Sequence, residues 1–420
     1  MILRYNCLML HFSPRRIALR VTPDAQAALR HGHPWLFAGS IVAQNDAGVV
    51  PQAGDLAVIF DDYRRFLAIG LYDPASPIRV RVLQHRHPVV IDAAFFAGRV
   101  QAALTRRAAL LADPLTTGLR LLHGEGDGLP GVVVDRYHDV QVLKLYSAAW
   151  VPHLPVLLEV LAAAAPAARM VLRLSRAVQA QAEALGGLAD GVTLVGEPPQ
   201  GPVVFLENGL RFEADVLHGQ KTGFFLDQRD NRARVGELAQ GRSTLNVFAY
   251  TGGFSLYAAR GAAPAVISVD IAAPAMAAAA RNFALNLALP AVAAAQHTLL
   301  VEDAFVALRR LANEGRRFGL VVVDPPAFAK QQSEISAALQ AYTRLAALAA
   351  RVTEPGGLLV MASCSSRVAA EAFFGAVRRG ALQVGTRLQE FDHTGHPLDH
   401  PVSFAEGAYL KCLYASVHRL

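Results

Sequence analysis

The stretch TLNVFAYTGGFSLYAARGAAPAVISVD, residues 244–270, decides the fold that we expect for this chain. It begins with an apolar run that ends in a Tyr-Thr-Gly-Gly turn, continues through a helical segment at 254–260, and closes with a second apolar run that ends on Asp270. A strand, a helix and a second strand in this order form the repeating unit of a parallel α/β sheet. The turn differs from the G-x-G-x-x-G pattern of dinucleotide-binding proteins, so a pyrophosphate cradle is not expected.

The same alternation continues toward the end of the chain. Apolar runs predict strands at 244–248, 265–270, 297–301, 320–324, 357–363, 382–391 and 409–416. Helical segments lie between them at 254–260, 273–287, 303–313, 335–351 and 367–379. We therefore predict an α/β fold with a mostly parallel, Rossmann-like sheet of seven strands and helices on both faces. No long helix separates the last two strands, which predicts an antiparallel pair at one edge.

The chain before residue 218 has shorter strands and predicts two further domains. Residues 15–86 contain five short strands and one helix, which begins at Thr22-Pro23 and ends at Gly32, and they predict a small β domain. Residues 87–217 predict an α+β middle domain with a helix at 91–111 and a hairpin turn at Asn208-Gly209. The remaining boundaries that we expect are an extension at 1–14 and a sheet domain at 218–420.

Composition narrows the class of protein. Of the 420 residues, 53% are hydrophobic and 18% are charged, which is typical of a packed globular enzyme and not of a disordered chain. The apolar runs are all interrupted before they reach the ~18 residues of a membrane span. Three cysteines are too few for a disulfide scaffold, and the first residues lack the pattern of a secretory signal. We therefore expect a cytoplasmic protein.

Positive charge is concentrated in one part of the chain. The formal net charge is +6, and residues 1–110 account for all of it, with thirteen Arg, no Lys and seven Asp. A basic domain beside a neutral one predicts a part that binds polyanions electrostatically, attached to a separate working part. The alternative is a general arginine enrichment without function.

Residues at the predicted strand ends indicate a cofactor. Ligands of such sheets bind at the carboxyl ends of the strands, where Gly252 and Gly253 would let backbone approach a ligand closely. Asp270, about twenty residues after the glycine turn, could accept hydrogen bonds from a ribose, and Asp303 lies in the right place for an adenine. Carboxylates without a phosphate cradle predict a nucleoside cofactor that carries a cation, such as S-adenosylmethionine. In the alternative interpretation, each Asp is an ordinary helix cap.

Two further strand ends predict where chemistry occurs. Asp324 is followed by two prolines, which forbid a helix and fix a rigid loop that could hold a planar base, with Phe328 available to stack on it. Cys364 follows the next strand, and a helix start and Arg367 after it would favour a thiolate. The alternatives are an ordinary turn and a small buried thiol. Cys7 and Cys412 are expected to be structural or incidental.

Residues 218–232 are too polar for a core strand. Within them, Lys221, Asp227, Gln228 and Arg229 could close over a cofactor. A solvated helix start explains the same pattern equally well.

Four motifs resemble those of class I S-adenosylmethionine-dependent methyltransferases, and specifically of the bacterial enzymes that make 5-methylcytosine in 23S ribosomal RNA. They are QKTGFFLDQR (220–229), YTGGF (250–254), DPP (324–326) and SCS (363–365). The resemblance extends to GHPW (32–35) in an N-terminal PUA RNA-binding domain, to GDGLPG (126–131) and to DHPV (399–402). It covers nearly the whole chain from about residue 15.

The resemblance implies a role for each predicted site residue. Cys364 would be the nucleophile that adds to C6 of cytosine, and Asp324 would hold the target base. Contacts to the cofactor are expected from Phe225, Asp227, Gln228, Tyr250, Thr251, Gly252, Gly253, Asp270, Asp303 and Pro325. Contacts to RNA are expected from Arg64, Arg65, Arg79, Arg81, Lys221, Phe328 and Lys330. No metal is expected, the partner is 23S ribosomal RNA, and a homodimer is possible.

One departure from related enzymes leaves a step open. Many RNA cytosine-C5 methyltransferases carry a second cysteine after the Asp-Pro pair, whereas Pro326 and Ala327 stand there in this chain. Removal of the C5 proton therefore needs another base, which the sequence does not identify. Two other functions remain as alternatives, methylation of another base atom such as a guanine nitrogen, and RNA binding without catalysis.

Overall fold

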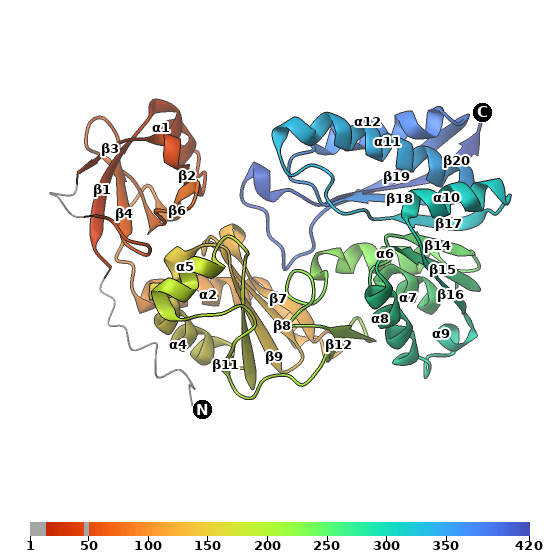
Figure 1. Ribbon diagram of the computed structural model, residues 1–420, viewed down its shortest axis with the longest axis horizontal. Coiled ribbons are helices and arrows are strands. Elements are labelled where there is room, and N and C mark those ends of the chain that lie inside the picture. Colours follow the sequence, from red (N-terminus) through yellow and green to blue (C-terminus); the bar gives the residue numbers. More distant parts are fainter. Residues whose placement is uncertain (1–13, 46–49) are drawn as a thin grey trace. The chain divides into compact units, whose positions relative to one another are not determined.

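The computed structural model describes residues 14–45 and 50–420 (Figure 1). The expected extension at 1–14 and Cys7 therefore lie almost entirely outside the described residues. The chain divides into two compact units. The first unit contains the residues up to Leu206 together with Ala214–Leu226 and Leu398–Phe404, and the second contains Glu207–Glu213, Asp227–Pro397 and Ala405–Leu420.

A small β domain opens the first unit. Its six-stranded sheet has the order β2-β6-β5-β4-β1-β3, in which β1 and β4 are parallel and the other neighbours are antiparallel. The elements are β1 (Arg16–Val21), α1 (Pro23–Arg30), β2 (Trp35–Phe37), η1 (Ala38–Ser40), β3 (Ile41–Asn45), β4 (Leu56–Phe60), β5 (Phe66–Tyr72) and β6 (Ile78–His85). Thr22 caps α1 as expected, because its side chain accepts a hydrogen bond from the Ala25 amide. Among the strands of this domain that the structure describes, the three-residue strand β2 is the one absent from the sequence prediction.

The rest of the first unit is an α+β domain around a second sheet. This sheet has the order β11-β10-β9-β8-β7. Its elements are α2 (Ala93–Arg106), α3 (Ala108–Ala112), β7 (Gly118–His123), η2 (Gly124–Asp127), β8 (Val132–Tyr137), β9 (Val140–Leu145), η3 (Ala148–His153), α4 (Leu154–Ala164), β10 (Arg169–Leu174), α5 (Gln179–Gly186) and β11 (Thr193–Val195). The β domain has a core of its own that includes Leu19 and Ile59, while its Leu56 and Leu71 pack in the core of the α+β domain around the buried Trp150.

The single helix expected at 91–111 is wrong, because Arg107 interrupts it. Arg107 is completely buried, and its guanidinium donates to the carbonyls of Ala103 and Arg120 and to the carboxylate of Asp127. A second buried pair joins Arg120 to Asp135, at 2.7 Å. The DHPV motif enters the same cluster, since the Asp399 carbonyl accepts from Arg107 and its carboxylate accepts from the Arg120 amide. The GDGLPG and DHPV motifs thus meet in one buried polar network, which we call the arginine–aspartate network.

A two-stranded hairpin of β12 (Val203–Glu207) and β13 (Leu210–Ala214) lies where the sequence passes between the units. Asn208 and Gly209 form its turn, both with positive φ, as the Asn-Gly pair predicts.

The second unit contains the predicted seven-stranded sheet, with the order β16-β15-β14-β17-β18-β20-β19. The pairs from β16 to β18 are parallel, and β20 is antiparallel to both β18 and β19, so the predicted antiparallel pair at the edge is confirmed. The strands are β14 (Thr244–Val247), β15 (Ala265–Asp270), β16 (Gln296–Val301), β17 (Phe318–Val323), β18 (Thr353–Ser363), β19 (Thr386–Thr394) and β20 (Lys411–Arg419).

Helices cover both faces of this sheet (Figure 1). They are η4 (Leu226–Gln228), α6 (Arg229–Leu238), α7 (Gly253–Arg260), α8 (Ala273–Ala284), α9 (Pro290–Ala294), α10 (Ala304–Asn313), η5 (Gln332–Glu334), α11 (Ile335–Val352), α12 (Ala370–Leu382) and η6 (Ala405–Gly407). Apolar side chains of α10, α11 and α12 form one core with the sheet, whereas α6 and α7 pack together in another layer. The strand expected from residue 382 starts only at Thr386, because α12 continues to Leu382 and the chain turns at Gly385 with φ of +66°.

Within residues 14–45 and 50–420, no helix combines the length and the apolar character that crossing a membrane requires.

Candidate cofactor and catalytic site

The predicted site residues of the second unit lie at one edge of its sheet. In the parallel register, Val247 pairs with Val269 on one side and with Val323 on the other, and Val323 pairs with Met361. These four strand ends lead into the glycine turn, Asp270, the DPP loop and Cys364. The sheet therefore brings together the four groups that the sequence predicts at its carboxyl rim.

The glycine turn has a backbone that few residues adopt. Phe248, Tyr250 and Gly252 have φ of +62°, +48° and +77°. Left-handed conformations at non-glycine residues are strained and gather at ligand-binding sites. A Cβ on Gly252 would lie 2.9 Å from Cβ of Ala279, so glycine is required there on steric grounds as well.

A buried ion pair supports the same turn. The Arg232 guanidinium donates twice to the Glu207 carboxylate, at 2.8 and 2.6 Å, and both side chains are buried. A Cβ on Gly253 would lie 2.8 Å from Cδ of Arg232, so this pair packs directly against the turn. The second glycine therefore serves close packing inside the protein.

Asp270 holds the turn in place through both carboxylate oxygens. Oδ2 accepts from the Tyr250 amide at 2.8 Å, and Oδ1 accepts from the Ala272 amide at 2.9 Å. Each carboxylate oxygen has a second lone pair, which leaves capacity for a ribose hydroxyl. Asp303 is exposed and caps α10 by accepting from the Val306 amide at 3.1 Å, as the alternative interpretation expects, so its role beside an adenine stays a prediction.

Two buried polar atoms near the turn fit a polar ligand. Oγ1 of Thr251, whose residue is only 7% exposed, and Oδ1 of Asn246 have no hydrogen-bond partner within the described structure. Buried polar groups are normally satisfied by protein, water or ligand. Together with the carboxylate of Asp270 they fit a nucleoside or amino-acid group, and the site lacks the phosphate cradle of a dinucleotide.

The polar segment before α6 is part of the folded interior. Gln228 is buried, and its Nε2 donates to Oδ2 of Asp324 at 2.9 Å, while its Oε1 accepts from Asn231 at 2.6 Å. The buried Asp227 accepts from the Tyr409 hydroxyl at 2.9 Å. These contacts exclude the solvated-helix interpretation for 227–229. Lys221 and Phe225 belong to the first unit, where the Lys221 ammonium lies 4.4 Å from the Phe225 ring centroid, and their roles stay predictions.

Cys364 is partly exposed, and its Sγ lies 4.0 Å from the Pro325 carbonyl oxygen. Its two neighbours fix the loop from either side. Ser363 shares a hydrogen bond with the Tyr342 hydroxyl at 2.9 Å, and the Ser365 hydroxyl donates to the Ala329 carbonyl at 3.2 Å. The thiol therefore lies beside the DPP loop and is not enclosed in the core. Cys412, by contrast, is completely buried, and burial raises the pKa of its thiol, as expected for a structural residue.

Lys411 is a site residue that the sequence prediction missed. It pairs with Ser363 in the β18–β20 register and is only 4% exposed. Its ammonium donates to the Ser365 and Val368 carbonyls, which brace the Cys364 loop. Burial lowers the pKa of Lys411 to about 8, and a negative charge on Cys364 acts in the opposite direction. A lysine inside the apolar run of residues 409–416 is the signal that could have revealed it.

The positive charge beside Cys364 comes from this lysine, and not from the helix start and Arg367 that the sequence predicted. The following helix, α12, begins only at Ala370, and Arg367 is exposed. A helix dipole acts mainly within its first turn, so it contributes little six residues away. Lys411 is the buried cation at this loop.

The predicted RNA contacts of the β domain fall into two groups. Arg64 and Arg65 are exposed in the β4–β5 turn, where the Arg65 guanidinium lies 5.1 Å from the ring centroid of Tyr63. Tyr63 is 81% exposed and is a candidate for base stacking that the sequence prediction missed, because exposure cannot be read from one tyrosine in a turn.

Arg81 and Arg79 are committed to contacts inside the protein. Arg81 is only 6% exposed, and its guanidinium donates to Glu125 at 3.0 Å and to the Tyr146 carbonyl at 3.2 Å. Arg79 donates to the Asp73 and Pro74 carbonyls. The burial of Arg81 indicates a structural role in place of the expected RNA contact, whereas Arg79 is partly exposed and its role in RNA binding stays a prediction. In the second unit, Lys330 is exposed and Phe328 packs on Tyr342 with ring centroids 5.0 Å apart.

Comparison with known proteins places these features in a family. Residues 120–390 match the family model of S-adenosylmethionine-dependent methyltransferases, and residues 19–85 match a PUA-like domain. The chain is 49% identical to a ribosomal RNA large subunit methyltransferase of Deinococcus radiodurans, over 96% of this chain and 98% of that protein. It is 37% identical to the ribosomal RNA large subunit methyltransferase I of Shewanella denitrificans, over 96% and 99%.

Solved structures confirm the expected fold. A protein described as a SAM-dependent methyltransferase from Streptococcus mutans covers 95% of this chain and 99% of its own, with a TM-score of 0.79 and 21% identity. A second similar structure, with a TM-score of 0.79 and 22% identity, was solved with S-adenosylhomocysteine. The expected class I methyltransferase fold, the N-terminal PUA-like domain and the cofactor S-adenosylmethionine are thereby confirmed. The chain belongs to the S-adenosylmethionine-dependent ribosomal RNA large subunit methyltransferase family.

Proposed function

We propose that this protein methylates C5 of a cytosine in 23S ribosomal RNA, through a covalent bond between Cys364 and C6 of the base. The observation that carries the proposal is the position of Cys364, partly exposed and 4.0 Å from the Pro325 carbonyl of the DPP loop. Methylation of a nitrogen needs no such thiol. The names of the relatives support large-subunit ribosomal RNA as the substrate.

The chemistry explains why a thiol is needed. C5 of cytosine is a poor nucleophile, and addition of the Cys364 thiolate at C6 makes C5 enamine-like. S-adenosylmethionine, when bound, supplies the methyl group that this carbon takes up from a positively charged sulfonium. Loss of the C5 proton to a base and elimination of the thiolate then restore the C5–C6 double bond and the free enzyme. The target base must be unpaired or flipped out of the helix for the thiolate to reach C6.

Asp324 would hold the base during this addition. Its carboxylate can accept a hydrogen bond from the exocyclic amine or from a protonated N3, where charge develops as the thiolate adds. Gln228 donates to Oδ2 of Asp324 at 2.9 Å and is itself fixed by Asn231, so the carboxylate is oriented before the base arrives. The prolines at 325–326 keep the loop rigid.

The residues around the glycine turn would hold the cofactor. Asp270 would accept from the ribose, and Thr251 offers a buried hydroxyl that has no other partner in the described structure. The remaining predicted cofactor contacts are Phe225, Asp227, Gln228, Tyr250, Gly252, Gly253, Asp303 and Pro325. Arg64, Arg65, Arg79, Lys221, Phe328 and Lys330 remain the proposed RNA contacts.

Analysis of the product nucleosides tests this function. Large-subunit ribosomal RNA from a strain that lacks the gene is incubated with the enzyme and S-adenosylmethionine, digested, and examined by mass spectrometry. We expect one new 5-methylcytidine. A methylated guanosine in its place would overturn the assignment of the base.

The variant Cys364→Ala tests the mechanism in the same assay. It should bind S-adenosylmethionine in calorimetry as the wild type does and transfer no methyl group. Full activity of this variant would exclude the covalent step.

A further inference from the structure

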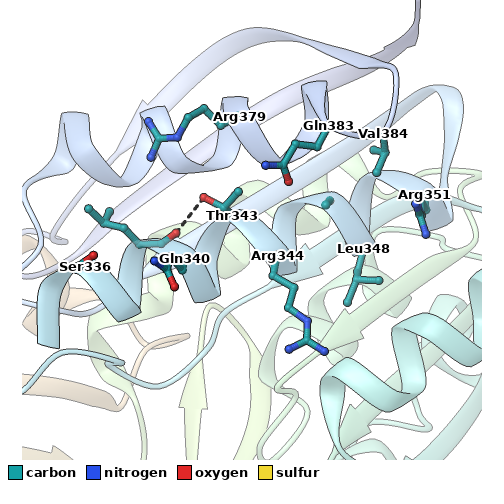
Figure 2. Close-up of a pocket in the computed structure, with 11 residues that line it drawn as sticks. Ser336, Gln340, Thr343, Arg344, Leu348, Arg351, Arg379, Gln383 and Val384 are labelled. Atoms are coloured by element: carbon teal, nitrogen blue, oxygen red, sulfur yellow. Dashed lines mark hydrogen bonds between the residues drawn. The ribbon is translucent and has the colours of Figure 1, made fainter.

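A groove lies between α11 and α12 (Figure 2). None of the predicted cofactor or catalytic residues lines it. Its volume is about 740 Å³. The residues that line it are Ser336, Leu339, Gln340, Thr343, Arg344, Ala347, Leu348, Arg351, Arg379, Gln383 and Val384. We call it the arginine groove, because its three charged residues are Arg344, Arg351 and Arg379.

A second hollow of about 370 Å³ continues it. It shares Arg351 and Val384 with the arginine groove and adds Arg317 and Arg419. The two linings together contain five arginines and no acidic residue within the described part of the chain. Burial, with a smaller contribution from Arg317, lowers the pKa of Arg419, which fits positive charges held close to one another.

Acidic residues of the neighbouring helices do not balance this charge. Glu302 and Glu314 pair with Arg310 in the α10 region, and Glu371 and Glu390 pair with Arg378. The helix α11 itself contains no Asp or Glu. Arg419 of the second hollow already donates to Thr386 and to the carbonyls of Ala350 and Thr353. Within the described residues no ion pair joins Arg344, Arg351 or Arg379 to an acidic side chain, so the charge of these three is available to an anion from outside.

The shape and lining of the groove fit a polyanion chain. Between its arginines lie the polar side chains of Ser336, Gln340, Thr343 and Gln383, next to apolar ones. Arginines bind phosphate through several N–H groups at once, and hydroxyl and amide groups can bond to sugar oxygens. The groove starts at Ser336, six residues after the proposed RNA contact Lys330, and follows α11 to Arg351 over about 22 Å.

We propose that the arginine groove binds the sugar-phosphate backbone of the RNA substrate, away from the nucleotide that is methylated. This inference rests on the proposed RNA substrate and adds a second contact surface to it. Arginine contacts to phosphates give affinity and position without reading sequence.

The salt dependence of RNA binding tests the groove. The triple variant Arg344→Gln, Arg351→Gln, Arg379→Gln is compared with the wild type on a single-stranded RNA of twenty nucleotides. Each lost phosphate contact lowers the slope of log K against log salt by ~0.7. We expect the slope to fall by about 2 and the dissociation constant at 0.1 M salt to rise by up to ~100-fold. The rate at saturating RNA should stay unchanged.

A matched control keeps the same change in net charge. The variant Arg211→Gln, Arg281→Gln, Arg387→Gln removes three exposed arginines of the second unit that do not line the groove. Its RNA binding should stay close to that of the wild type, and thermal melting should show that both variants are folded.

Three results would overturn the proposal. One is an unchanged slope of log K against log salt in the groove variant, and another is an equal loss of RNA affinity in the control variant. The third is a groove variant that binds RNA as the wild type does but no longer binds anionic phospholipid vesicles. The identity of the methylated nucleoside is read on the wild type, so failure of the groove is distinguishable from failure of the proposed function.

Discussion

Replacing Lys411 by methionine should change how the free energy of unfolding depends on pH. The ammonium is buried behind the Cys364 loop, and burial lowers its pKa from 10.5 to about 8. In the unfolded chain the amine returns to its ordinary value. Between these two pKa values the unfolded state binds more protons than the folded one, so stability rises with pH in this range.

The size of the effect follows from the two pKa values. Each pKa unit corresponds to about 1.4 kcal/mol, so the full difference is about 3 kcal/mol. Only part of it falls in the accessible range, and the gain in stability between pH 7.5 and 9.5 is about 2 kcal/mol. Methionine has a similar length and no proton to bind, so the variant lacks this gain.

Urea denaturation of both proteins at several pH values measures the effect. Other groups titrate equally in both proteins, so the quantity of interest is the difference in unfolding free energy between wild type and variant. It should shift by about 2 kcal/mol in favour of the wild type from pH 7.5 to 9.5. The control Lys330→Met removes an exposed lysine and should show a constant difference. If the unfolding free energies of Lys411→Met and the wild type change in parallel with pH, the reasoning is refuted.

Three further predictions concern other parts of the molecule. Gly252→Ala forces an alanine into φ of +77°, so calorimetry should show at least tenfold weaker S-adenosylmethionine binding; unchanged binding would contradict the proposed role of the turn. Asp127→Ala leaves Arg107 buried without its carboxylate and should cost about 3–5 kcal/mol in urea denaturation, whereas a loss below 1 kcal/mol would show that the arginine–aspartate network matters little. Arg64→Gln should weaken RNA binding without changing the melting temperature, because Arg64 is exposed. Arg81→Gln should lower the melting temperature, because Arg81 is buried against Glu125. Weaker RNA binding of Arg81→Gln at an unchanged melting temperature would restore Arg81 as an RNA contact.

The sequence predicted the sheet well because its signal is local. Apolar runs at 265–270 and 320–324 alternate with amphipathic segments, and this pattern alone indicates parallel strands with covering helices. Since such strands present their carboxyl ends at one edge, the glycine turn, Asp270, the DPP loop and Cys364 could be placed together before the structure was known.

Contacts between distant segments could not be predicted in the same way. The interruption of the first long helix depends on Arg107 meeting Asp127 and the Asp399 carbonyl, and nothing near residue 107 reveals this. Arg81 appears in the sequence as one more arginine of a basic domain, yet Glu125 holds it in the interior. The role of a charged side chain is decided by its partner, and the partner is known only from the fold.

Two of the elements that were missed are very short. The strand β2 has three residues and the helix α9 has five, too few for periodicity to show. The start of β19 was placed too early because residues 382–391 read as one apolar run, although Leu382 ends a helix. Lys411 is different, since a lysine within an apolar strand was visible in the sequence and was not interpreted.

The covalent bond between Cys364 and the target cytosine can be trapped with RNA that carries 5-fluorocytidine. After thiolate addition and methyl transfer, fluorine at C5 cannot leave as a proton does, so the enzyme stays bound to its product. We predict that the wild type with S-adenosylmethionine gives a protein–RNA band on a denaturing gel, that mass spectrometry places the linked nucleotide on Cys364, and that Cys364→Ala gives no band. Methylation of the natural RNA with no trapped complex, or a trapped complex with Cys364→Ala, would contradict this mechanism.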